Sequence, residues 1–180
     1  VTVGTGIGGG LILDGRVYRG ASYSAGEIGH TTVVFDGERC ACGNRGCLEK
    51  YASVTALSKT AQKHLSENKK AGLKRFLENG KVTVGAVVAA AGKKEKTALV
   101  LVERQAAYLA AGLASALNLV NPERLILGGG FLDVYPEFLK MVEKQIYKRA
   151  FPAAVKNLRI LKAELGNQAG IVGAAFLEKD

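Results

Sequence analysis

Short hydrophobic runs separated by glycines dominate the first part of the chain and predict β-strands rather than helices. Val1–Val3 and Leu11–Leu13 are apolar runs of strand type. Asp14-Gly15 is a dipeptide typical of a hairpin turn, so Arg16–Arg19 is predicted to form the returning strand. His30–Phe35 is rich in β-branched residues, and we expect it to be extended as well.

The hydrophobic period becomes helical after a loop rich in Cys and Gly at residues 36–47. A helix is predicted to begin at Leu48. Its apolar face contains Leu48, Ala52, Ala56, Leu57, Ala61 and Leu65. A short helix is expected around Leu73–Leu77, and another over Thr83–Ala91, which Gly92 can end.

The longest predicted helix lies in the second half of the chain. Apolar residues step by three and four from Leu99 to Val120, and Asn121-Pro122 ends the pattern because proline cannot continue the helical hydrogen bonding. Leu125–Leu127 and Leu158–Ala163 have the composition of short strands.

Two more helices are predicted near the end of the chain. One follows Gly128-Gly129-Gly130 and has Pro136 near its first turn, a position that proline favours. Its apolar face contains Phe138, Leu139, Val142 and Ile146. The last helix follows Gly166-Asn167, and its small residues would allow another helix to approach closely: Gly170, Gly173, Ala174 and Ala175.

A β-meander followed by alternating helices and strands predicts the α/β class, with residues 1–180 in a single domain. The chain starts at Val1, in what resembles the middle of a strand, so we expect it to be part of a longer protein. The longest apolar run has nine residues, Ala106–Ala114, whereas a membrane span needs about 20. We find no signal-peptide pattern and expect a cytoplasmic protein without membrane contact.

The chain contains 25 Lys and Arg against 16 Asp and Glu, a net charge of +9. This charge favours either an anionic ligand or a solvated surface. Aromatic residues do not interleave with the basic groups, so we expect no nucleic acid to bind to this chain. The basic groups are Lys63, Lys69, Lys70, Lys74 and Arg75, then Lys93, Lys94 and Lys96.

All the cysteines, Cys40, Cys42 and Cys47, lie within eight residues, a spacing too tight for a disulfide framework. Zinc prefers four ligands in a tetrahedron, and His30 is available as the fourth. We predict a structural Zn²⁺ site, because four protein ligands leave no position for a reactive water. The alternatives are free thiols or a catalytic cysteine, which would need a base rather than two neighbouring thiols.

Gly4, Gly6 and Gly9 match the G-x-G-x-x-G pattern of dinucleotide-binding proteins. That motif requires a helix after the glycines, and here a hairpin follows, so we reject this interpretation. Two interpretations remain from the residues alone: a plain tight turn, or a turn whose backbone N–H groups and Thr5 hydroxyl approach a phosphate.

Three segments taken together resemble the ROK family of repressors and sugar kinases. They are Gly4–Gly10, Ala25–His30 and Cys40–Glu49, and Asn121-Pro122 and Leu127–Gly130 also fit the family pattern. The resemblance implies the actin-like, ribonuclease-H-like ATPase fold, in which two lobes enclose a nucleotide and a sugar. The chain resembles the C-terminal lobe, which carries the family's zinc-binding loop.

The resemblance also implies roles for individual residues. Glu27, His30 and Glu49 match positions that bind sugar hydroxyls, and His30 and the three cysteines match the zinc ligands. A carboxylate suits this role because it accepts hydrogen bonds from adjacent hydroxyls with charge-assisted strength. The alternative for both glutamates is a surface position or a contact to the zinc ligands.

Four further residues match nucleotide-binding positions of the family. Thr5 and Gly6 match a phosphate loop, and Gly128 and Gly129 match the adenosine loop, where the absence of side chains admits the base. The alternative for Gly128 and Gly129 is a plain turn between a strand and a helix. ATP and Mg²⁺ are therefore expected as ligands of the intact protein.

The resemblance implies that the intact protein is an ATP-dependent kinase acting on the 6-hydroxyl of glucose or a related hexose, and a homodimer. Such a kinase also needs an Asp as general base and a magnesium-binding carboxylate, which lie in the absent N-terminal lobe. None of Asp14, Asp36, Asp133 and Asp180 fits the base, so we expect the isolated chain to be inactive. The alternatives are a sugar-sensing repressor and a zinc module without a sugar site.

Overall fold

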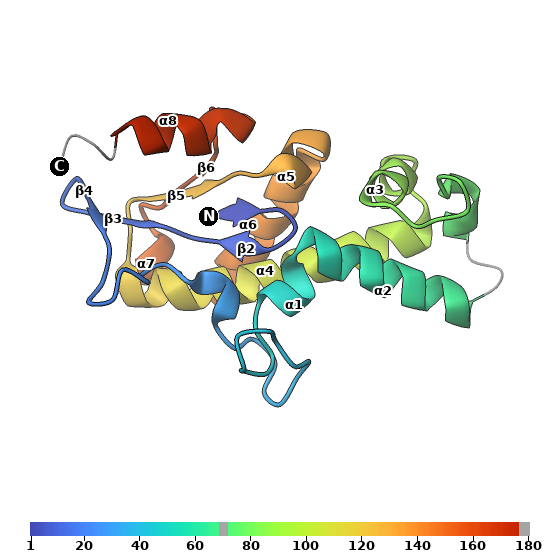
Figure 1. The fold of residues 1–180 in the computed structure, drawn as a ribbon, viewed down its shortest axis with the longest axis horizontal. Helices are drawn as coiled ribbons and strands as arrows, with labels where there is room; N and C mark the ends of the chain where they lie inside the picture. The colour runs from blue at the N-terminus through green and yellow to red at the C-terminus, as the bar shows by residue number, and fades with distance from the viewer. Residues whose placement is uncertain (69–71, 177–180) are drawn as a thin grey trace.

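The computed structural model describes residues 1–68 and 72–176 (Figure 1). The strands are β1 Thr2–Val3, β2 Ile7–Gly8, β3 Leu11–Leu13, β4 Arg16–Tyr18, β5 Arg124–Leu127 and β6 Arg159–Lys162. The α-helices are α1 Glu49–Ala52, α2 Val54–Glu67, α3 Val84–Gly92, α4 Lys96–Val120, α5 Gly130–Val134, α6 Glu137–Arg149, α7 Pro152–Val155 and α8 Ala169–Phe176. Short 3-10 helices are η1 Ile28–His30, η2 Gly72–Phe76 and η3 Gly166–Gln168.

Strands from both ends of the chain meet in the middle of the molecule. β1 pairs antiparallel with β2, and β5 pairs parallel with β6. A parallel bridge between Thr2 and Gly128 joins the two pairs, and Val3 N donates a 2.8 Å hydrogen bond to Gly128 O. The predicted hairpin is confirmed, because β3 and β4 pair across Asp14-Gly15.

Helix α4 is the centre of the hydrophobic core. It packs against α6, α3, α1 and α2, and in Figure 1 it runs along one side of the strands. Its buried face includes Val102, Ala106, Leu109 and Leu113, as the stepping by three and four predicts. Asn121 ends the helix in a left-handed conformation (φ 45°), which asparagine tolerates better than most residues.

The helix predicted from Leu48 is interrupted, which corrects the expectation of one continuous element. Ser53 is extended (φ −76°, ψ 164°) and separates α1 from α2. Its hydroxyl accepts a 3.1 Å hydrogen bond from Ala56 N, so it acts as the N-cap of α2. The short helices α5 and α7 were also not predicted from the sequence.

Residues 31–35 do not form the strand that their β-branched composition predicts. The first residue of the predicted strand, His30, is the last residue of η1. Within residues 31–35, only Thr32 forms a β-bridge, and its partner is Cys47. Val33 N and Val34 N both donate to Gly46 O, at 2.9 and 3.3 Å. These backbone groups are therefore satisfied within the Cys-rich loop, and tertiary context overrides strand propensity.

The small residues of α8 do not bring another helix close within the described part of the chain. No α8 residue is buried, and a Cβ added at Gly170 or Gly173 would meet nothing within 4 Å. In Figure 1, α8 lies on the side of β5 and β6 opposite to α4. The small residues leave room for a close approach, and no helix of the described ranges uses it.

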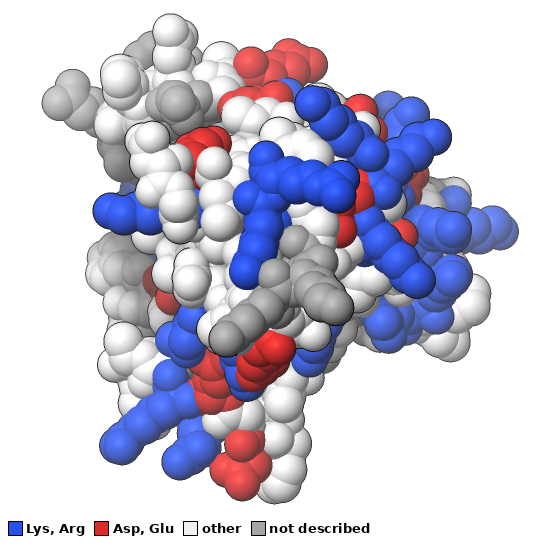
Figure 2. Space-filling model, turned by 90° about the vertical axis from the view of Figure 1, so that its right-hand side faces the viewer, with Lys and Arg blue, Asp and Glu red and all other residues white. Residues whose placement is uncertain are grey.

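On the face that Figure 2 shows, basic side chains lie on a surface of mixed charge rather than in a uniform patch. Figure 2 shows Asp and Glu side chains among the Lys and Arg side chains of one face. Lys69, Lys70 and Asp180, named in the sequence analysis, lie outside the described residues. In the ranges 1–68 and 72–176, no helix combines the length and apolar character needed to cross a bilayer.

We predict that Gly129→Ala destabilises the fold, because Gly129 has a positive φ of 104° and an added Cβ would collide with Val3 O. Strain of this kind costs roughly 1–3 kcal/mol. Urea unfolding should show a loss of about 2 kcal/mol or more. Gly130→Ala is the matched control, because a Cβ at Gly130 meets nothing within 4 Å. An equal effect of the two substitutions would contradict the role of the Val3 contact.

Candidate functional site

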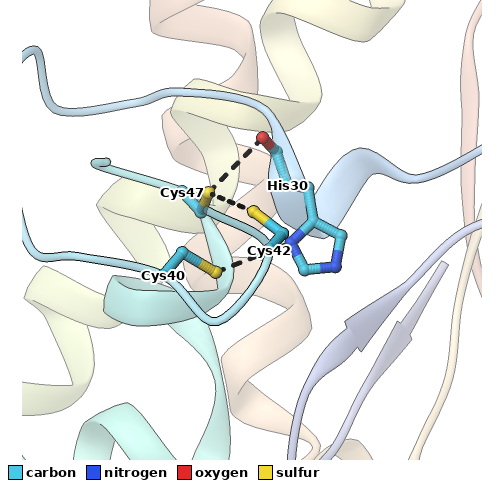
Figure 3. Close-up of side chains that lie close together, drawn as sticks. All are labelled: His30, Cys40, Cys42 and Cys47. Atoms are coloured by element: carbon cyan, nitrogen blue, oxygen red, sulfur yellow. Dashed lines mark hydrogen bonds between the residues drawn. The ribbon is translucent and has the colours of Figure 1, made fainter. Parts of the chain in front are cut away.

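Four side chains from residues 30–47 gather around one point at the end of the Cys-rich loop (Figure 3). They are His30, Cys40, Cys42 and Cys47, and their potential ligand atoms all lie within 4.8 Å of one another. The His30 Nδ1 atom is 3.7 Å from Cys40 Sγ, and the sulfurs of Cys42 and Cys47 are 3.6 Å apart. The structure therefore brings together the four residues predicted to bind zinc.

The geometry fits a tetrahedral metal ion. With Zn–S bonds of about 2.3 Å, two sulfurs of a tetrahedral zinc site lie about 3.8 Å apart. The 3.6 Å separation of the Cys42 and Cys47 sulfurs is close to this value, and all four ligand atoms lie within 4.8 Å of one another. The four residues could hold one zinc ion with all positions filled by protein, which is the arrangement of structural rather than catalytic sites.

Glycines allow the loop to fold back on itself around the cysteines. Gly43 and Gly46 have positive φ values of 95° and 72°, and a Cβ at Gly46 would collide with Val34 O. Cys40 N donates a 2.8 Å hydrogen bond to Asn44 O, which closes the turn that carries Cys42. The loop is thus organised by backbone contacts and by the thiol cluster, with little hydrophobic core.

The thiols of the cluster differ in acidity. Hydrogen bonding from Cys42, chiefly from its backbone, lowers the pKa of Cys40 to about 7, against the opposing effect of burial. Burial raises the pKa of Cys47 to about 12, and the neighbouring Cys42 and Cys40 add to the rise. A metal would replace the Cys47 proton, because thiolates are the ligands that zinc binds.

His30 has its second ring nitrogen turned away from the sulfurs (Figure 3). The His30 Nε2 atom is 3.9 Å from Glu27 Oε2, and the two side chains are 37% and 63% exposed. This distance is too long for a direct hydrogen bond. Both polar groups are therefore accessible to a ligand on the same side of η1.

Glu49 makes a contact that the sequence analysis did not anticipate. Its Oε2 atom accepts a 2.9 Å hydrogen bond from Ile7 N, and a Cβ at Gly6 would collide with this carboxylate. A side chain at position 6 would therefore displace the Glu49 carboxylate from Ile7 N. The Oε1 atom of Glu49 has no hydrogen-bond partner among the described groups.

The turn at residues 4–7 is anchored to the junction between α1 and α2. Val54 N donates to Gly4 O at 2.9 Å, and the Thr55 hydroxyl donates to Thr5 O at 2.8 Å. Within the described ranges, the N–H groups of Thr5 and Gly6 donate no hydrogen bond. These two amides and the Thr5 hydroxyl are therefore free donors on a fixed backbone.

Gly128 and Gly129 lie at the end of β5, directly beside β1. Gly128 N donates to Val1 O at 2.9 Å, and Gly129 packs against the backbone of Val3. Because Val3 directly precedes the turn at residues 4–7, Gly128 and Gly129 lie close to that turn in space. The close strand contact explains Gly129 without a ligand, and the adenosine role of both glycines stays a prediction.

One continuous chain of contacts thus links the predicted site residues. It runs from Gly129 through the turn that contains Thr5 and Gly6 to Glu49, and then through the Cys-rich loop to His30 and Glu27. Sequence reasoning missed Val54 and Thr55, which hold the turn. The only signal for them was the serine at position 53, a residue type that favours helix N-caps.

Comparison with known proteins identifies the family. The sequence model of the ROK family matches residues 1–180, and the chain therefore belongs to the ROK family. A glucokinase from Halalkalibacterium halodurans is 35% identical over 99% of this chain and 55% of its own length. A xylose repressor from Caldicellulosiruptor bescii is 32% identical over 96% of this chain and 43% of its own length.

A solved structure agrees with this assignment. The crystal structure of a ROK family glucokinase from Streptomyces griseus, in complex with glucose and AMPPNP, superposes with a TM-score of 0.88 at 34% identity. The match covers 98% of this chain and 58% of that one. The fold is thus that of the ROK sugar kinases, as expected, and the chain spans about half the length of the relatives it matches.

We predict that the purified chain contains close to one zinc per molecule, and that Cys42→Ser loses it. Removing one thiolate from the cluster leaves three ligands and breaks the closed tetrahedral shell. Elemental analysis after dialysis against a weak chelator measures the content. His64→Gln is the control, because His64 lies in α2 outside the cluster. Equal zinc in wild type and Cys42→Ser would contradict the proposed ligand set.

Proposed function

We propose that this chain is the C-terminal lobe of an ATP-dependent hexose kinase that phosphorylates the 6-hydroxyl of glucose or a related hexose. The observation that carries the proposal is the placement of the Glu49 carboxylate between the Cys-rich loop and the glycine turn. Glu49 is two residues from Cys47 and accepts a hydrogen bond from Ile7 N. One side chain therefore borders both a candidate sugar site and a candidate phosphate site.

On the sugar side, the proposal assigns Glu27, His30 and Glu49 to hydroxyl groups of the hexose. The accessible Glu27 carboxylate and the free Glu49 oxygen accept hydrogen bonds from hydroxyls. A structural zinc on Nδ1 would fix the His30 ring and leave its Nε2–H to donate. A zinc-bound histidine keeps one tautomer, so the donor points in a defined direction.

On the nucleotide side, the proposal assigns the free amides of Thr5 and Gly6 to a phosphate of ATP. Successive backbone N–H groups in a turn form a concave anion site. Gly128 and Gly129 would lie against the adenosine. The general base and the Mg²⁺ carboxylate would come from the rest of the intact protein, because phosphoryl transfer depends on both for positioning and charge stabilisation.

A sugar-sensing transcriptional repressor is the second candidate, favoured by a specific observation. Repressor relatives match almost the whole chain at 31–32% identity, close to the 35% of the glucokinase. In a repressor the same lobe would bind the sugar without transferring phosphate. The N-terminal sequence of the intact protein separates the two: an Asp-x-Gly-Gly-Thr loop favours the kinase, and a helix-turn-helix favours the repressor.

We predict that the intact protein phosphorylates a hexose at about 1–100 s⁻¹, in the range of ordinary kinases, whereas the isolated 180-residue chain does not. The isolated chain lacks a candidate general base, so in-line transfer has no proton acceptor. A coupled assay with Mg·ATP and glucose, N-acetylglucosamine or N-acetylmannosamine measures both. Turnover by the isolated chain would contradict the two-lobe proposal. If the intact protein shows no turnover, the result would favour the repressor.

We predict that Glu27→Gln in the intact protein weakens hexose binding by roughly 10-fold or more and leaves the zinc content unchanged. A hydrogen bond to a charged group contributes about 1.5–3 kcal/mol, which corresponds to this range. Calorimetric titration with the best hexose measures the affinity. The control is Glu38→Gln, which removes an exposed carboxylate of the Cys-rich loop that pairs with Lys59. Equal affinities for the Glu27 and Glu38 variants would exclude Glu27 from the sugar site.

A further inference from the structure

One buried glutamine of α4 connects the core to the segment that holds the candidate site. Among the described residues, Ser53 and Gln105 are the two buried polar or charged residues, and each is 2% exposed. The Gln105 Nε2 atom donates to Ala52 O at 2.9 Å and to Ser53 O at 3.1 Å. Both carbonyls lie at the junction where α1 ends and α2 begins.

The two carbonyls differ in their need for this donor. Ser53 O also accepts a 3.0 Å hydrogen bond from Leu57 N, whereas Ala52 O has no other donor among the described groups. Ala52 is fully buried, so losing Gln105 would leave a backbone carbonyl without a partner. Gln105 thus stabilises the break between the two helices.

Burying the polar side chain of Gln105 at this position costs free energy. Its Oε1 atom is buried and has no partner among the described groups, which costs free energy that an apolar side chain would avoid. Its benefit must therefore come from the two bonds that Nε2 donates. Those bonds tie the α1–α2 junction to α4.

The junction in turn places the glycine turn. Glu49, Val54 and Thr55 flank Ala52 and Ser53 on both sides, and each makes one of the three hydrogen bonds that anchor residues 4–7. A shift of the junction would therefore move the Glu49 carboxylate and the free amides of Thr5 and Gly6 together. A displacement of about 1 Å at such a site is enough to cost two orders of magnitude in rate.

Two further α4 residues hold α1 from the same side. Gly112 lies two helical turns after Gln105, and a Cβ there would come within 2.6 Å of Leu48 Cδ2. The Tyr108 ring packs against that of Tyr51 in α1, with centroids 4.9 Å apart and the ring planes tilted by 37°. These apolar contacts hold α1 against α4, and Gln105 supplies the hydrogen bonds that define its C-terminal end.

We propose that Gln105 is a positioning residue that sets the common placement of Glu49 and of the Thr5–Gly6 amides, so that one contact in the core tunes both the sugar and the phosphate sites. The ligand part of this proposal rests on the proposed function, and the structural part does not. Gln105 touches no ligand in this assignment and acts only through the α1–α2 junction.

The test compares Gln105→Met with Ile146→Ala in the intact protein. Methionine is similar in size and removes both donors. Ile146→Ala truncates a fully buried α6 side chain and serves as a control for general destabilisation. Amide hydrogen exchange is followed at Ile7 and Val54, relative to Val142 in α6, together with zinc content and the affinities for hexose and for Mg·ATP.

Gln105→Met is expected to lower the protection of Ile7 and Val54 at least 10-fold relative to Val142, to weaken both ligands about 10-fold, and to keep the zinc. Ile146→Ala should show neither the selective loss nor the weaker binding. Parallel behaviour of the two variants, or affinities within twofold of wild type for Gln105→Met, would overturn the proposal. If wild type binds neither ligand, the proposed function fails, and the exchange ratio still decides whether Gln105 places the turn.

Discussion

The site depends on how one short segment, from Glu49 to Thr55, is held between the core and the glycine turn. Three hydrogen bonds tie the turn at residues 4–7 to this segment, and the Ile7 side chain is buried in the core. The segment in turn lies against α4 through a pair of tyrosine rings, a glycine that admits Leu48 and the Gln105 amide. Since α4 has more buried residues than any other helix of the described ranges, these contacts anchor the site to the core.

The Cys-rich loop is ordered by interactions other than hydrophobic burial. Residues 31–47 contribute few buried hydrophobic side chains, so hydrophobic burial alone cannot order them. The loop is instead held by backbone hydrogen bonds to Gly46 and by the cluster of His30 with the three cysteines. A metal bound to such a cluster stabilises the folded loop directly, because the unfolded chain offers no preformed site. His30 joins this loop to Glu27, and Cys47 joins it to Glu49.

Kinases and repressors share the ROK family, and the proposed sugar site would suit either class. In that proposal, a carboxylate and a metal-oriented imidazole would bind a sugar whether or not phosphate is then transferred. Transfer adds the need for a general base and a metal-binding carboxylate, which belong to the remainder of the intact protein in the proposed scheme. The chain covers 55% of the glucokinase relative and 43% of the xylose repressor.

The sequence by itself determined the elements with a strong local signal: the hairpin at Asp14-Gly15, the long helix ended by Asn121-Pro122, and the cysteine spacing that predicts a metal site. It could not locate the break at Ser53 or the irregular path of residues 31–35. In both places backbone groups bond to partners distant in sequence, so local propensity does not decide the conformation. The tertiary structure alone placed Glu49 on Ile7 N and Gln105 under the α1–α2 junction. Those contacts join residues 42 and 53 positions apart, a separation that no local pattern records.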